Sequence, residues 1–163
     1  LFLHEDTVPI HKNISISIDA SNYASQDLDK MYIGRLNYRG QPYYTTTYRN
    51  GNKLTAKTRT FGKYTLATDT TPPTVEAENF KDGQWISKHS TLELKIDDDL
   101  SGIASYRATL NGRFILTEYD YKTDSLTYYF SDNVVTEAEN NLKLIVLDNV
   151  GNSTTFEATF FRK

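Results

Sequence analysis

The residues most able to do chemistry are three consecutive aspartates, Asp97, Asp98 and Asp99, in the stretch KIDDDLSGIAS. A second acidic stretch, LDNVGN, contains Asp148 and Asn149. Loops collect Asp and Asn because these side chains hydrogen-bond their own backbone in turns. Calcium binding is the alternative, because this ion takes roughly six to eight oxygen ligands, although neither stretch has EF-hand spacing. These five residues are therefore candidates for a calcium site or for simple turns.

Other catalytic arrangements have no support in the sequence. The histidines His4, His11 and His89 do not form His-Glu-x-x-His or another close ligand spacing. There is no cysteine, no Gly-x-Ser-x-Gly nucleophile elbow and no glycine-rich phosphate loop. We therefore expect this chain not to be an enzyme, to require no cofactor and to bind no zinc.

Tyrosine is abundant, with twelve residues in the chain. The segment QPYYTTTY places Tyr43, Tyr44 and Tyr48 close together, and such a patch could stack against sugar rings. Alternating aromatic residues on a strand are, however, often half buried and half exposed. The three tyrosines are a candidate carbohydrate-binding surface, with ordinary strand packing as the alternative.

The elements that would position these residues are β-strands. Apolar and polar residues alternate with period two in run after run, most plainly in NISISIDA, which is typical of strands with one buried face. Asn50-Gly51 and Asn111-Gly112 indicate hairpin turns, and only VVTEAENN, residues 134–141, could form a short helix. The sequence predicts strands near residues 13–20, 31–38, 42–49, 53–60, 63–69, 74–80, 84–87, 91–97, 103–110, 113–119, 126–130, 142–148 and 153–161.

Two consecutive prolines, Pro72 and Pro73, cannot lie inside a central strand. We place a domain boundary there, with an N-terminal β-sandwich domain over residues 1–71 and a C-terminal one over residues 72–163. The spacing of the strands in the second part is typical of an immunoglobulin-like sandwich, although the cysteine pair is absent. The predicted fold is all-β, with two tandem immunoglobulin-like sandwiches joined by a short, stiff Pro-Pro linker.

Immunoglobulin topology predicts at which end of the second sandwich the two acidic stretches lie. The loop of residues 97–102 would join strands B and C and the loop of residues 148–152 would join F and G, and these loops lie at one end of the sandwich. Strand A would start at the same end, and Asp120 and Asp124 would lie beside it. Residues 1–71 carry nine Lys and Arg against six Asp and Glu, whereas residues 72–163 carry nine against fifteen. We therefore expect the acidic end to face the linker and the basic front domain.

The acidic end could interact with the basic front domain in two ways, through direct ion pairs or through a bridging cation. Exposed ion pairs contribute only about 0–1 kcal/mol each, so they would bias the angle between the domains. A bridging cation would hold the angle more firmly.

The composition of the chain argues against two further classes of protein, membrane-spanning proteins and nucleic-acid-binding proteins. No apolar run approaches the roughly 20 residues of a membrane-spanning helix, and a net charge of −3 gives no basic footprint for nucleic acid. The chain begins with Leu1, and LFLHEDTVPIH does not have the pattern of a signal peptide. We expect a piece of a longer protein.

Nearly the whole chain resembles a known protein region. The stretches LHEDTVPIHKNISISIDASNY, KMYIGRLNYRG, TRTFGKYTLATDTTPPTV, DDLSGIASYRATLNGRFILTEYD and LDNVGNSTTFEATFFRK are similar to the region after the catalytic domain of lysostaphin-type bacterial zinc metalloendopeptidases, which cut peptidoglycan. The metal site of that family, a His with a downstream Asp and a His-x-His pair, is absent here, so no catalytic residue is carried over.

The resemblance implies a non-catalytic accessory role in the bacterial cell envelope, in the periplasm, at the cell surface or secreted. It implies the protein's own upstream peptidase domain as a partner, with peptidoglycan or an envelope protein as further candidates. Two alternatives stay open beside this spacer and binding module: a calcium-stiffened adhesion or structural module, and a carbohydrate-binding module.

Overall fold

The computed structural model describes residues 1–23, 28–134 and 137–163. The chain divides into two compact units, and the division passes between Thr71 and Pro72. It also assigns two short loop tips, Leu100–Gly102 and Asn149–Gly151, to the first unit. Unit 1 is therefore Leu1–Thr71 with these two tips, and unit 2 is the rest of the chain. The division into two tandem domains at 1–71 and 72–163 stays a prediction.

The regular secondary structure of the described residues consists of strands and two short 3-10 turns, so the all-β prediction is confirmed. The short helix expected over residues 134–141 is not seen where that segment is described, because a strand begins at Glu139. Residues 135 and 136 lie outside the described part. No helix in the described ranges is long and apolar enough to cross a membrane.

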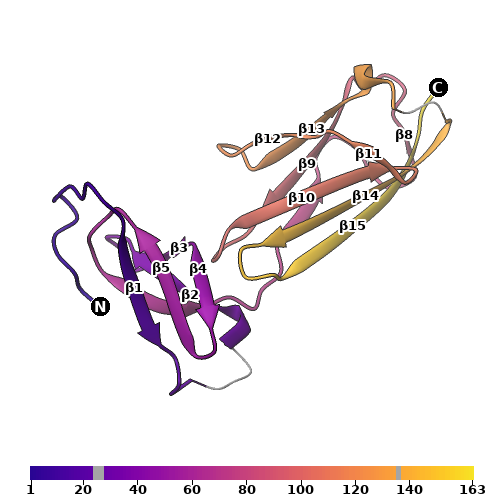
Figure 1. Ribbon diagram of the computed structural model, residues 1–163. Helices are drawn as coiled ribbons and strands as arrows, with labels where there is room; N and C mark the ends of the chain where they lie inside the picture. The colour runs from indigo at the N-terminus through magenta and orange to yellow at the C-terminus, as the bar shows by residue number, and fades with distance from the viewer. Residues whose placement is uncertain (24–27, 135–136) are drawn as a thin grey trace. The chain divides into compact units, whose positions relative to one another are not determined.

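The described strands of unit 1 are β1 (Ile14–Asp19), β2 (Met31–Leu36), β3 (Pro42–Thr45), β4 (Thr47–Asn50), β5 (Lys53–Thr58) and β6 (Tyr64–Thr68), and the 3-10 turn η1 (Leu28–Lys30) precedes β2. They form two antiparallel sheets (Figure 1). One sheet has the order β1-β5-β4 and the other the order β3-β2-β6. Period-two alternation explains β1 and β5, which turn one face toward the interior, whereas β2 is buried on both faces over residues 31–34.

The core of unit 1 lies between these two sheets. Leu54 and Ala56 alternate with Lys53 and Lys57 along β5, so one face of the strand is buried and the other exposed. Residues of both sheets contribute to the core. Tyr64 of β6 is buried in it, and the Tyr64 hydroxyl donates to the Thr60 carbonyl oxygen at 2.6 Å. The buried cluster is Ile16, Ala20, Leu28, Met31, Ile33, Leu54, Ala56 and Tyr64.

A glycine is required in β2 of unit 1. A Cβ atom at Gly34 would lie 2.6 Å from the Cβ of Pro42 on the adjacent strand β3, and proline cannot swing away. Gly34→Ala should therefore destabilise unit 1 by about 1–3 kcal/mol through overpacking. Urea unfolding followed by far-UV circular dichroism measures the loss.

The matched control for Gly34→Ala is Lys57→Ala, at an exposed position of β5. It should change the free energy of unfolding by less than about 0.5 kcal/mol. Equal stability of Gly34→Ala and the unmodified chain would contradict the close packing of β2 against Pro42.

The described strands of unit 2 are β7 (Thr74–Ala77), β8 (Gln84–Trp85), β9 (Thr91–Asp97), β10 (Ile103–Leu110), β11 (Arg113–Ile115), β12 (Glu118–Asp120), β13 (Ser125–Tyr129), β14 (Glu139–Asp148) and β15 (Ser153–Phe161), and the 3-10 turn η2 (Phe130–Asp132) follows β13. One sheet has the order β11-β10-β14-β15-β8 and the other β12-β13-β9-β7. Among the described strands of this unit, the short edge strand β8 is the one that pairs in parallel, with β15.

The strand order of unit 2 is that of an immunoglobulin-type sandwich. Lettered in sequence, with β8 left aside as an extra edge strand, β7, β9, β13 and β12 correspond to the A, B, E and D strands of one sheet. β10, β14 and β15 correspond to C, F and G of the other. Unit 1 has a different strand order, so immunoglobulin topology describes unit 2.

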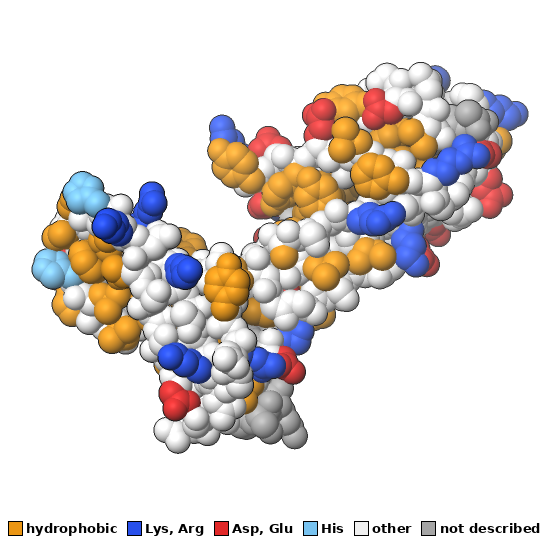
Figure 2. All heavy atoms as spheres, in the orientation of Figure 1, with side chains coloured by type: hydrophobic (Ala, Val, Ile, Leu, Met, Phe, Trp, Pro, Cys, Tyr) orange, Lys and Arg blue, Asp and Glu red, His pale blue; other side chains and the backbone are white. Residues whose placement is uncertain are grey.

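The core of unit 2 lies between its two sheets. Along β14, Leu142, Leu144 and Val146 are buried and alternate with exposed or half-buried residues. The buried apolar cluster is Phe80, Ile86, Leu92, Leu94, Ile96, Ala108, Leu110, Ile115, Leu126, Tyr128, Phe130, Leu142, Leu144, Val146, Ala158 and Phe160. On the face drawn in Figure 2, Lys and Arg side chains predominate over unit 1, and most of the carboxylate side chains lie over unit 2.

Two segments predicted as single strands each supply two strands in different sheets. Residues 42–49 divide at Thr46 into β3 and β4, and Thr47 Oγ1 stabilises the change by accepting from Ile33 N at 2.9 Å and donating to Thr45 O. Residues 113–119 divide at Leu116, which is exposed between buried Ile115 and Thr117. Periodicity alone does not reveal such crossings, because the alternation continues through them.

Candidate functional site

The acidic stretches lie in two loops at one end of unit 2. The first follows β9, which ends at Asp97, and the second follows β14, which ends at Asp148. Ile103 at the start of β10 pairs with Asp148 at the end of β14, and Thr74 at the start of β7 pairs with Asp97. The starts of β7 and β10 and the ends of β9 and β14 therefore share one end, as the immunoglobulin topology requires.

Asp98 and Asp148 come together at this end. Their carboxylate oxygens lie within 4.8 Å of one another. Asp148 is 2% exposed and is held in place by Asn152, whose backbone N–H donates to Oδ1 at 2.8 Å and whose Nδ2 donates to Oδ2 at 2.6 Å. Two facing carboxylates, one of them fixed, form an arrangement that a divalent cation can neutralise.

Asp97 and Asp99 do not belong to this carboxylate group. Both are exposed, and Asp97 Oδ1 accepts from the neighbouring Asp98 N–H at 2.8 Å. Successive residues of an extended chain point to opposite sides, so consecutive aspartates cannot all face one ion. Of the three, the structure selects Asp98.

Asn149 joins the two loop tips that belong to unit 1. Its Nδ2 donates to the carbonyl oxygens of Ser101 and Gly102, at 2.9 Å each, and its backbone N–H also donates to the Gly102 oxygen at 3.0 Å. Gly102 and Gly151 allow these tight tips because both have φ near +80°. Asn149 uses its amide nitrogen as a structural donor.

A buried residue of this region that the sequence did not single out is Asp69. Its side chain is fully buried in unit 1. Oδ2 accepts from the Ser101 backbone N–H at 3.0 Å, and Oδ1 accepts from the Thr71 N–H at 3.0 Å. The contact with Thr71 is an Asx-type turn, in which an Asp side chain accepts from the backbone N–H two residues later. The sequence could have indicated this local contact. The contact with Ser101 spans 32 positions and has no local sequence signal.

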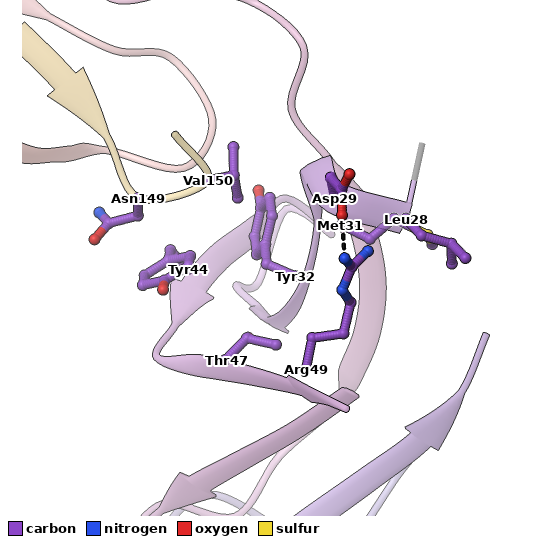
Figure 3. A pocket seen from close by; sticks show the side chains of 9 residues that line it. All are labelled: Leu28, Asp29, Met31, Tyr32, Tyr44, Thr47, Arg49, Asn149 and Val150. Atoms are coloured by element: carbon purple, nitrogen blue, oxygen red, sulfur yellow. Dashed lines mark ion pairs between the residues drawn. The ribbon is translucent and has the colours of Figure 1, made fainter. Parts of the chain in front are cut away.

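Unit 1 also contains a small pocket beside these tips (Figure 3). Its volume is about 220 Å³. The rings of Tyr32 and Tyr44 lie 5.4 Å apart on its wall, and Arg49 forms an ion pair with Asp29 across it. The lining residues are Leu28, Asp29, Met31, Tyr32, Tyr44, Thr47, Arg49, Asn149 and Val150. Because the cationic side chain is already paired with a carboxylate, this pocket is a poor site for an anion.

The candidate tyrosines do not share a surface. Tyr43 and Tyr44 are consecutive in β3 and so point to opposite faces of its sheet. Tyr44 lines the pocket, whereas Tyr43 is 59% exposed. Tyr48 is 63% exposed on β4, which belongs to the other sheet of unit 1. The chain changes sheets between Tyr44 and Tyr48, which separates residues that are neighbours in sequence.

The turn between β12 and β13 lies beside the end of β9, where the sequence placed Asp120 and Asp124. The Asp124 carbonyl oxygen accepts from Ile96 N at 2.8 Å. The Asp124 carboxylate accepts from the Tyr119 hydroxyl at 3.0 Å. Burial, followed by the hydrogen bond and the negative charge of Asp124, raises the pKa of Tyr119 to about 12. All of these effects favour the neutral phenol.

Tyr119 should make the stability of unit 2 depend on pH in alkaline solution. Its pKa is raised in the folded state, so its contribution is complete below the ordinary value of 10.0 and is lost as pH rises toward about 12. Tyr119→Phe should flatten the decline of unfolding free energy over that interval and should remove a late step from the tyrosinate absorbance titration. An unchanged titration in Tyr119→Phe would contradict this assignment.

Residues 1–69 match the family model of the Zu5-like domain. This match covers less than half of the chain. No curated protein matches the chain significantly.

Three solved structures are similar in fold at low sequence identity. The endo-β-1,4-mannanase from Thermotoga petrophila has 11% identity and a TM-score of 0.47, over 58% of this chain and 20% of its own. The fibronectin(III)-like modules of Clostridium thermocellum CbhA have 12% identity and a TM-score of 0.42, over 94% and 87%. A chimeric titin tandem has 14% identity and a TM-score of 0.35, over 93% and 91%.

The chain spans one fifth of the mannanase, and similarity at this level concerns the fold alone. None of these comparisons supports parentage in a lysostaphin-type peptidase, so that resemblance stays a prediction.

Proposed function

We propose that the chain is a non-catalytic accessory module that spaces or positions a neighbouring zinc peptidase domain in the bacterial cell envelope. The observation that carries the proposal is the use of buried polar side chains. Asp69, Asn140 and Asp148 are each nearly inaccessible, and each bonds to the backbone of a loop. Buried polar side chains that hydrogen-bond to the backbone of loops make the connections between strands rigid. A spacer needs such rigid connections.

The envelope setting of this proposal comes from the sequence resemblance. It assigns the protein to the periplasm, the cell surface or the secreted fraction, with an upstream peptidase domain as its partner in the same protein. Peptidoglycan or an envelope protein is the second partner. The net charge of −3 favours neither nucleic acid nor an anionic surface.

A fusion experiment tests the accessory role. The chain is placed after a lysostaphin-type catalytic domain, and the solubilisation of purified sacculi is compared with that by the catalytic domain alone. We expect a several-fold change in rate and co-sedimentation of the fusion with sacculi. The matched control carries Phe160→Ala, which disrupts the core of unit 2, and should lose the effect. Identical rates and identical sedimentation for all three proteins would refute the proposal.

Calcium stiffening is a second candidate, favoured by the facing carboxylates of Asp98 and Asp148. Calcium needs roughly six to eight oxygen ligands, so these two residues would supply part of the set and carbonyl groups or water the rest. Bound calcium would neutralise the repulsion between the two carboxylates and tie the β9–β10 loop to the end of β14.

Thermal unfolding with millimolar calcium or with EDTA distinguishes this candidate. The Tm of the unmodified chain should rise with calcium, and the rise should disappear in Asp98→Asn. The matched control is Asp99→Asn, which makes the same change one residue further on at an exposed side chain and should keep the response. A Tm that does not respond to calcium removes the candidate. The carbohydrate-binding alternative has less support, because Tyr43 and Tyr44 point to opposite faces of β3 and Tyr48 lies in the other sheet.

A further inference from the structure

The chain contains two Asn-Gly pairs, and each lies at a tight hairpin. Asn50 is the last residue of β4 and pairs with Lys53, so Gly51 and Asn52 form the turn. Asn111 and Gly112 themselves form the turn between Leu110 and Arg113. In an Asn-Gly pair the backbone nitrogen of glycine can attack the asparagine side chain with little hindrance, because glycine has no Cβ atom.

The structure holds the side chain of Asn111 in place. Its Nδ2 donates to Asn140 Oδ1 at 3.1 Å, to Glu139 O at 3.3 Å and to Glu137 Oε2 at 3.4 Å. Its Oδ1 accepts from the Asn141 N–H at 2.8 Å. The amide cannot rotate toward Gly112 unless these contacts break.

Asn50 has none of this restraint. Asn50 is exposed, and its side chain makes no hydrogen bond with any residue in the described ranges. The next residue, Gly51, has φ +59° and no atom within 4 Å of the position a Cβ would take. Gly51 lies outside the β4–β5 pairing, which ends at Asn50. The side chain of Asn50 and the backbone of Gly51 are therefore exposed and uncrowded at the tip of this hairpin.

We propose that Asn50 is a site of spontaneous deamidation in the native protein, whereas Asn111 is protected. The Gly51 nitrogen attacks Cγ of Asn50 and gives up its proton, the bond from Cγ to Nδ2 breaks, and ammonia leaves. The product is a five-membered succinimide. Water then opens the ring at either carbonyl and gives aspartate or isoaspartate at position 50.

The site suits the product. Lys53 pairs with Asn50 on one side and with Asp19 of β1 on the other. A carboxylate at position 50 would therefore lie opposite a lysine and be tolerated at the surface. Isoaspartate would also lengthen the backbone at the end of β4, so the two products should differ in their effect on the hairpin.

Peptide mapping by mass spectrometry tests the proposal on the full chain aged in mildly alkaline buffer, with isoaspartyl methyltransferase as a second readout. Asn50 should convert faster than Asn111 by about tenfold or more, since each hydrogen bond that must break slows the reaction by a factor of roughly two to ten. In urea-denatured chain the difference should shrink to a few-fold or less.

The denatured chain is the matched control, because it contains the same two Asn-Gly pairs without their structure. Equal conversion of both sites in the native protein would overturn the proposal, as would faster conversion at Asn111. It would also be overturned if neither site reacted in the native chain while both reacted in the denatured one.

Discussion

Replacing Phe160 with alanine should cost unit 2 about 3–5 kcal/mol of unfolding free energy. Phe160 is fully buried on β15, and its ring lies 6.0 Å from that of Phe80 and 5.9 Å from that of Phe130 in edge-to-face arrangements. Alanine would remove the contacts of both rings and leave a cavity that the β-sheets cannot close. Domains of this kind have about 5–15 kcal/mol of stability in total, so a large part would be lost.

The measurement can be confined to unit 2. Its Trp85 is the only tryptophan of the chain, so urea unfolding followed by tryptophan fluorescence reports this unit. The matched control is Phe114→Ala on β11, because Phe114 is 57% exposed and should change stability by less than about 0.5 kcal/mol. Similar midpoints for the two variants would contradict the placement of Phe160 at the centre of the core.

Asp69→Ala should destabilise unit 1 by about 1–3 kcal/mol, because the buried N–H of Ser101 would lose its acceptor. The change should also appear locally, as faster hydrogen exchange at the Ser101 amide. Asp69→Asn keeps one acceptor oxygen, so its free energy of unfolding should lie between those of the unmodified chain and of Asp69→Ala. These outcomes follow from a side chain that serves two backbone donors at once.

Asp19→Ala is the matched control for Asp69. Asp19 also accepts two hydrogen bonds, from the backbone and the hydroxyl of Ser21, but it is not buried. Water can replace both bonds, so Asp19→Ala should cost clearly less unfolding free energy than Asp69→Ala. Exchange at Ser101 that is unchanged in Asp69→Ala would show that Asp69 does not hold this loop tip.

Much of the fold could be predicted from the sequence, because alternation with period two directly reports a strand with one buried face. The strand with NISISIDA and the two strands on either side of Asp97–Asp99 lie within the predicted ranges, whereas β14 begins at Glu139, before the predicted residue 142. The changes of sheet at Thr46 and Leu116 could not be predicted, because they depend on which neighbours the strands pair with. The turn after β4 also lies one residue later than Asn50-Gly51 suggests, since the register of β4 against β5 places Asn50 opposite Lys53.

The candidate site could be predicted only in part. Loop composition identified the acidic stretches, and topology placed both loops at one end. Which aspartate faces Asp148 depends on side-chain direction in an irregular loop, and sequence spacing does not determine this. Asp69 was missed because its decisive partner, the Ser101 amide, is distant along the chain.

The proposed function requires that this chain supports a peptidase domain and does not itself hydrolyse peptidoglycan. The most direct measurement is the release of soluble fragments from purified peptidoglycan by the folded 163-residue protein in the presence of zinc, followed by chromatography and mass spectrometry. We expect no release above that of buffer alone. Release that depends on zinc and on the protein would contradict it.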